Sequence, residues 1–113
     1  MKKYVFIITD RNRNNLHVGM STNIIGTMNF YRKMANLFFD SGQQLTRLVY
    51  FEELNTQAEA EQRFKIINRF TRPQKEKMIR AVNTDWIDLT PGLNYEQLKT
   101  RTLNPQSVLS FAS

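Results

Sequence analysis

The sequence predicts an α+β domain, in which a small three-stranded antiparallel sheet is flanked by helices in the order β-β-α-β-α-α. Three observations support this fold class. Three short segments are rich in β-branched and aromatic residues, and two longer ones repeat apolar residues at helical spacing. A chain of 113 residues also has the size of a single domain. We expect residues 1–90 to form this domain and residues 91–113 to be a C-terminal extension, partly helical or frayed.

The first two strands are predicted to form a hairpin. Residues 3–9 are dominated by Tyr, Val, Phe and Ile, and residues 16–20 form a second short apolar run. Between them lies the polar stretch 10–15, which contains three Asn residues. Because Asn tolerates left-handed backbone geometry, this stretch is typical of a turn between antiparallel strands.

A helix is predicted to follow the hairpin. Ser21, Thr22 and Asn23 can each cap its N-terminus, and apolar residues then recur at spacings of three and four up to Phe38. We expect the helix to run to about residue 39 and to end at the Asp-Ser-Gly stretch 40–42. Residues 47–53 then read as the third strand.

Two more helices are predicted after the third strand. Thr56 can cap a helix through about residue 70, whose buried side carries Ala60, Phe64, Ile67 and Phe70. Lys65, Arg69 and Arg72 are expected to project together on its other side. A second helix is expected over residues 73–82, because its proline suits the first helical turn. Residues 86–89 are apolar enough to dock on the core. The Pro-Gly pair 91–92 is expected to interrupt the chain before a short helix over residues 95–101.

The composition excludes several kinds of site. The chain has no Cys, so it forms no disulfide and no thiolate metal site, and its one His, His17, excludes a multi-histidine metal cluster. A divalent ion would therefore need carboxylate ligands. No apolar run approaches the roughly 20 residues that span a bilayer, and the N-terminal apolar run is too short for a signal peptide. We expect a cytoplasmic protein without a membrane partner.

The net charge of +6 is concentrated in residues 63–80. This segment holds one acid, Glu76, and the rest of the chain sums to zero. A concentrated positive field attracts a polyanion, most commonly nucleic acid, although a solvated helix face is the alternative interpretation. The predicted nucleic-acid-binding residues are Arg63, Lys65, Arg69, Arg72, Lys75, Lys77 and Arg80.

Four stretches together resemble a known family. Residues 4–7, 17–19, 47–53 and 83–89 are similar, in order and spacing, to the small single-domain bacterial proteins of the GIY-YIG nuclease superfamily. The resemblance covers roughly residues 3–89 and implies the same α+β layout. It also implies an activity, the cutting of phosphodiester bonds with one divalent ion.

The resemblance does not extend to most of the functional positions. The two motif tyrosines of the family fall at Phe6 and His17, its arginine at Thr27, a polar His or Tyr position at Tyr31, and its metal-binding Glu at Phe64. Four of these five positions have lost the family residue. Hydrolysis needs a base, an activated water and positive charge beside the developing oxyanion, which Phe and Thr side chains do not supply.

Neighbouring residues could compensate for these losses. Tyr4 lies two residues from Phe6 and is expected on the same strand face. His17 could act as a base, and Glu61 is a weak candidate for a metal ligand. Arg32 and Lys33 could supply positive charge. The alternative for all five residues is a purely structural role, either in packing or on a solvated surface.

Three functions remain open from the sequence. The favoured one is a catalytically degenerate GIY-YIG-like domain that needs no cofactor and binds nucleic acid, with DNA preferred. The second is a divergent but active endonuclease dependent on Mg²⁺ or Mn²⁺, and the third is a protein-interaction module. The third interpretation, and any homo-oligomer, would use the apolar residues of the C-terminal tail: Tyr95, Leu98, Leu103, Val108, Leu109 and Phe111.

Overall fold

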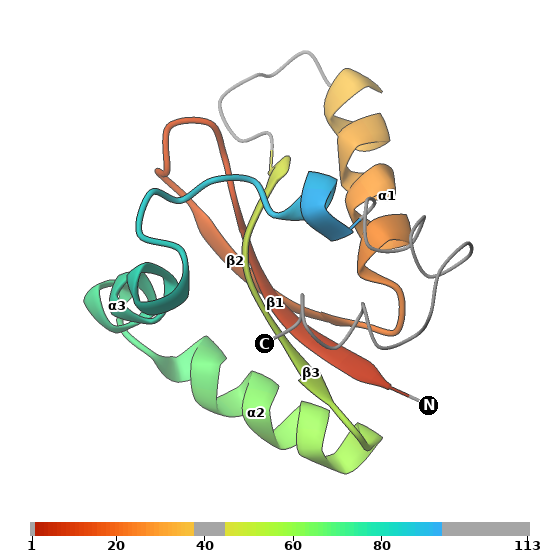
Figure 1. Ribbon diagram of the computed structural model, residues 1–113, viewed down its shortest axis with the longest axis vertical. Helices are drawn as coiled ribbons and strands as arrows, with labels where there is room; N and C mark the ends of the chain where they lie inside the picture. The colour runs from red at the N-terminus through yellow and green to blue at the C-terminus, as the bar shows by residue number, and fades with distance from the viewer. Residues whose placement is uncertain (1, 38–44, 94–113) are drawn as a thin grey trace.

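Figure 1 shows the computed structural model, which describes residues 2–37 and 45–93. Within these ranges the order β-β-α-β-α-α and the α+β class are confirmed. The elements are β1 (Lys3–Thr9), β2 (Leu16–Ser21), α1 (Ile24–Leu37), β3 (Arg47–Leu54), α2 (Gln57–Arg69) and α3 (Arg72–Val82).

The three strands form an antiparallel sheet in the order β2-β1-β3. In the centre of β1, Phe6 lies opposite Gly19 of β2 and Phe51 of β3. The β1–β3 pairing shifts by one residue between Ile7 and Ile8, which leaves Val49 as the extra residue of β3. Such a bulge bends the strand locally and changes which face the following side chains occupy.

Each face of the sheet carries its own apolar cluster. Alternation along β1 sends Val5 and Ile7 to one face, where they pack with residues of α2 and α3, and sends Phe6 and Ile8 to the other, where they pack with residues of α1. Figure 1 accordingly shows α1 on one side of the sheet and α2 with α3 on the other. We call these the α1 face and the α2–α3 face.

Each of the three helices begins at a residue whose side chain caps its N-terminus. The side chain of Asn23 accepts the N–H of Gly26 at 3.0 Å at the start of α1, and the Thr56 hydroxyl accepts the N–H of Glu59 at 3.1 Å at the start of α2. Thr71 and Gln74 form a reciprocal capping box at the start of α3. The predicted buried stripe of α2 is also confirmed: two of its residues are fully buried, and two are partly buried and pack against the same cluster.

The segment after α3 returns to the sheet, as expected. Trp86 is 5% exposed and belongs to the cluster of the α2–α3 face. The expectation that Pro91 and Gly92 interrupt the chain is wrong, because residues 90–93 form one helical turn. Asp88 accepts the N–H of Thr90 at 3.1 Å at the start of this turn, and a proline in a first turn loses no helical hydrogen bond.

Several expectations lie outside the described residues. The end of the first helix at residues 40–42, the helix over residues 95–101 and the apolar tail all belong to the stretches that the structure does not describe. The domain boundary and a homo-oligomer formed through the tail therefore stay predictions. In the parts of the chain that the structure does describe, no helix combines the length and apolar character needed to cross a bilayer.

Candidate nucleic-acid interface

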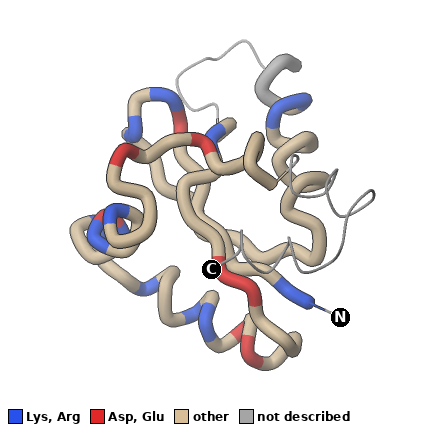
Figure 2. Tube along the Cα trace, in the orientation of Figure 1, with Lys and Arg blue, Asp and Glu red and all other residues tan. Residues whose placement is uncertain are grey.

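The predicted basic residues lie on two consecutive helices. Only residues 70 and 71 separate α2 from α3, so the end of α2 lies close to the beginning of α3. Figure 2 shows acidic residues near the beginning of α2 and basic ones toward its end and on α3. Glu59 in the first turn and Arg69 in the last turn of α2 both suit the helix dipole. The positive charge is therefore displaced toward the α2–α3 junction.

Three of the seven basic residues are already paired. Arg63 forms a salt bridge with Glu52 of β3 at 2.7 Å. On α3, Glu76 pairs with Arg72 at 2.9 Å and more distantly with Arg80 at 3.7 Å. The charge of these three arginines is therefore partly neutralised. The net charge of residues 63–80 includes Glu76 but not Glu52, so it did not reveal the pairing of Arg63.

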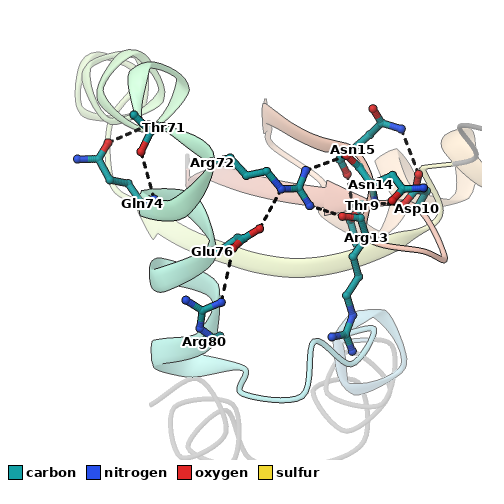
Figure 3. Close-up of polar contacts among 10 residues, drawn as sticks. All are labelled: Thr9, Asp10, Arg13, Asn14, Asn15, Thr71, Arg72, Gln74, Glu76 and Arg80. Carbon is teal, nitrogen blue, oxygen red and sulfur yellow. Dashed lines mark hydrogen bonds and ion pairs between the residues drawn. The ribbon is translucent and has the colours of Figure 1, made fainter.

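The remaining basic residues are available to a partner. Lys65, Arg69 and Lys77 are exposed and Lys75 is half-buried, and none of the four has an ion pair among the described residues. We call these four residues, together with Arg80, whose contact with Glu76 is the longer one at 3.7 Å, the basic surface. The sequence-based expectation that Arg72 projects with Lys65 and Arg69 from one side of a helix is wrong. Arg72 is the first residue of α3, and its guanidinium points toward the loop between β1 and β2 (Figure 3).

The structure adds two basic residues that the sequence had not singled out. Arg11 and Arg13 lie in the loop 10–15, and both are exposed. This loop contacts α3 through Arg72, whose Nη1 donates to the carbonyl of Asn14 at 2.8 Å. The net charge of the residues outside 63–80 is zero, because acidic residues elsewhere balance these two arginines, so that sum did not single them out. A local count over the turn would have found them.

Arg63 belongs to a hydrogen-bonded triad with Glu52 and Tyr50. Burial works against ionisation of Glu52, yet hydrogen bonds from Arg63 and from the Tyr50 hydroxyl outweigh it and lower the pKa of the carboxyl group. Burial and the bond to Glu52 raise the pKa of Tyr50, and the bond to Glu52 raises the pKa of Arg63. Near neutral pH, Glu52 and Arg63 are therefore charged, Tyr50 keeps its proton, and the three side chains stay hydrogen-bonded.

The family's catalytic positions are divided between the two faces of the sheet. Phe6, His17, Thr27 and Tyr31 gather on the α1 face: Phe6 is 2% exposed, and the rings of His17 and Tyr31 lie 6.1 Å apart. Phe64 instead packs against the cluster of the α2–α3 face. These five positions therefore do not face a single site.

Small polar groups surround Thr27 at the beginning of α1. Its hydroxyl lies 2.7 Å from that of Ser21, and an open depression of about 330 Å³ adjoins it. The depression is lined by Ser21, Thr22, Asn23, Gly26, Thr27 and Phe30. Its lining offers hydroxyl and amide groups, but neither the base nor the cation that hydrolysis requires.

The candidates for compensation are dispersed. His17 is exposed on the α1 face, whereas Glu61 lies on the exposed side of α2 and accepts a hydrogen bond from Gln57 at 2.8 Å. Tyr4 packs against the cluster of the α1 face. Arg32 forms a salt bridge of 2.6 Å with Asp88 and is not a free cation, and Lys33 is exposed. Within residues 2–37 and 45–93, no three His, Cys, Asp or Glu residues lie together as metal ligands would.

Comparisons with known proteins point to the same fold. No protein-family model and no curated protein matches the chain. The structure is similar to the solution NMR structure of the UPF0213 protein BH0048 from Bacillus halodurans, with a TM-score of 0.51 and 18% sequence identity. The match covers 80% of this chain and 95% of that chain. At this identity the likeness is one of fold. The chain therefore shares the fold of that UPF0213 protein, which agrees with the α+β layout that the sequence motifs imply.

Proposed function

We propose that this domain binds nucleic acid, DNA in particular, through the basic surface and does not cut it. The observation that carries the proposal is that α2 and α3 present three exposed basic residues without an ion pair among the described residues: Lys65, Arg69 and Lys77. Such residues contact phosphates and give an affinity that depends little on base sequence and strongly on salt.

The absence of cutting is inferred from the replaced positions. Phe6 has no group that exchanges a proton, Thr27 carries no charge, and Phe64 cannot ligate a metal. The motif resemblance to GIY-YIG proteins supports a nuclease-like ancestry, and the loss of these groups supports a binding role for the retained scaffold. The prediction that no divalent ion is needed belongs to this proposal.

The test is binding to labelled DNA as a function of salt. A branched DNA, the matching duplex and the single strand are titrated with the protein by fluorescence anisotropy, beginning near 50 mM salt, where phosphate contacts are strong. We expect binding that weakens steeply as salt rises. In the variant Lys65→Ala/Arg69→Ala, the slope of log K against log salt should fall by about 2, one unit for each lost phosphate contact.

The matched control changes the same net charge elsewhere. Lys2 and Lys33 are exposed and lie outside the basic surface, so Lys2→Ala/Lys33→Ala should leave the slope within about half a unit of the wild type. Absence of binding by the wild type at low salt would refute the proposal. Equal effects of the two double variants would show general attraction by net charge, and would refute the assignment to α2 and α3.

A further inference from the structure

The loop between β1 and β2 is fastened to α3 by one arginine. Arg72 donates from Nη1 to the carbonyl of Asn14 at 2.8 Å, from Nη2 to the carbonyl of Arg13, and from Nε to Glu76 at 2.9 Å (Figure 3). A guanidinium presents several donors in a fixed fork, so it can hold two adjacent carbonyls and a carboxylate at once. A lysine at this position would keep the charge but not this geometry.

A second fastening joins the loop to the segment after α3. Arg13 donates from Nη2 to the carbonyl of Asp85 at 3.0 Å, and its guanidinium carbon lies 5.3 Å from the centre of the Trp86 ring. Since Trp86 is 5% exposed, the cation stacks on a side chain that the core holds in place. The loop is thereby fixed against both the beginning of α3 and the segment that follows its end.

The loop is also ordered from within. Asp10, which is 4% exposed, accepts the N–H of Asn14 at 2.7 Å and the side-chain amide of Asn15 at 3.1 Å. The hydroxyl of Thr9 donates to the carbonyl of Asn15 at 2.7 Å. These hydrogen bonds fix the backbone conformation of the turn and thereby the positions from which its side chains project.

Arg13 has an unfavourable backbone conformation. Its φ is 60°, in the left-handed region that Asn adopts more readily than Arg, although Asn residues stand on both sides of it. Such a conformation is unfavourable for a residue other than Gly and persists where surrounding contacts enforce it, often at functional sites. Arg72 and Asp85 supply those contacts here.

We infer that the loop 10–15 is a second part of the nucleic-acid interface, with Arg11 and Arg13 as phosphate contacts and Arg72 as a positioning residue that holds the loop beside α3. This inference rests on the proposed function and extends its binding site to the β1–β2 hairpin. Arg11 and Arg13 are exposed, and the contacts with Arg72 and Asp85 hold their loop against α3, the helix that carries Lys75, Lys77 and Arg80. A guanidinium is well suited to a phosphate, because its paired N–H groups match two phosphate oxygens.

The test is a double-mutant cycle on DNA binding. Arg11→Ala should weaken binding to the labelled duplex by about three- to tenfold near 50 mM salt and lower the salt slope by about 1. Arg72→Lys retains the charge but loses the fork, and should weaken binding comparably. Because Arg72 is inferred to act through the loop, Arg11→Ala/Arg72→Lys should lose less affinity than the two single losses multiplied together.

Two further measurements separate positioning from folding. In Arg72→Lys, the backbone amides of Arg13 and Asn14, which donate to Asp10, should exchange with deuterium faster than in the wild type, while the amides of β1 and β3 stay protected. Lys33→Ala removes one exposed charge on α1 and serves as the control for Arg11→Ala. It should change neither the affinity nor the slope beyond the scatter of the assay.

The outcomes distinguish this inference from the proposal on which it rests. If the wild type binds no DNA, both fall. If the wild type binds and Arg11→Ala behaves like Lys33→Ala, the interface lies on α2 and α3 alone and only the inference is overturned. Independent, multiplicative losses in the cycle would make Arg72 a direct phosphate contact and overturn its positioning role.

Discussion

The guanidinium of Arg63 on α2 lies against the carboxylate of Glu52 on β3, with Nε 2.8 and 2.9 Å from the two carboxylate oxygens and Nη2 2.7 Å from one of them. This forked contact ties α2 to the edge strand of the sheet. It also withdraws Arg63 from the residues that can meet a phosphate. The same interaction thus stabilises the fold and defines where the basic surface ends.

Acid should weaken the contact of Glu52 with Arg63. The pKa of Glu52 is lowered from its ordinary value of 4.5, so its carboxylate stabilises the fold above that value and loses this effect as the pH falls through the lowered pKa. We expect Glu52→Gln to reduce the free energy of unfolding by about 1–2 kcal/mol at pH 7. Urea unfolding from pH 7 to about pH 2.5 should show this difference shrink as the pH falls below 4.5 and vanish only below the lowered pKa of Glu52.

The control for this pH series is Glu59→Gln. Glu59 is exposed at the start of α2 and has no salt bridge among the described residues, so its replacement should change the unfolding free energy by less than about 0.5 kcal/mol at pH 7. A Glu52→Gln deficit of unchanged size at low pH would contradict the assigned ion pair.

Gly19 leaves room for the ring of Phe6. A Cβ atom at position 19 would lie 2.5 Å from Cζ of Phe6, which is far inside van der Waals contact, and Phe6 is 2% exposed. We expect Gly19→Ala to lower the free energy of unfolding by about 1–3 kcal/mol, measured by urea denaturation. The double variant Phe6→Leu/Gly19→Ala should recover part of that loss relative to the sum of its single changes. Strict additivity would show that the ring does not cause the cost.

Asp88 joins three parts of the chain. One carboxylate oxygen accepts the N–H of Leu48 at 3.2 Å and both the N–H and the hydroxyl of Thr90, and the other pairs with Arg32 at 2.6 Å. Asp88→Ala removes all of these bonds and should cost about 2–3 kcal/mol in unfolding free energy. Asp88→Asn keeps an acceptor oxygen and should cost roughly half as much. Equal costs would assign the whole effect to the ion pair.

Restoring the family's acid at position 64 should not create a nuclease. Phe64 packs in the cluster of the α2–α3 face, whereas Phe6, His17 and Thr27 lie on the α1 face. We expect Phe64→Glu to lower the unfolding free energy by about 1–3 kcal/mol and to give no nicking of supercoiled DNA with Mg²⁺ or Mn²⁺. Phe64→Leu, the control, should cost less than Phe64→Glu.

Nicking by the pure wild type would overturn the non-catalytic interpretation. Variants His17→Ala and Glu61→Ala would then test the compensating base and the compensating metal ligand. Activity that survives both changes would assign cutting to a contaminant or to groups outside these candidates.

The sequence by itself determined the elements and their order. The caps at Thr56 and Thr71 and the alternation along β1 depend on neighbours within a turn or a strand, so local pattern was sufficient for them. The order β-β-α-β-α-α that the motifs imply is also the order in the structure. The net charge was evident from the sequence, and the replacement of most family catalytic residues stays a prediction from the motif resemblance.

Only the tertiary structure decided which of those residues act together. Arg63 meets a partner 11 residues away and Arg72 meets carbonyls 58 and 59 residues away, so no local pattern could show that these cations are engaged. The path of the chain also placed Phe6 and Phe64 on opposite faces of the sheet and brought the loop of Arg11 and Arg13 to α3. Contacts between distant segments depend on how whole layers pack, and this packing decides which charges remain free for a partner.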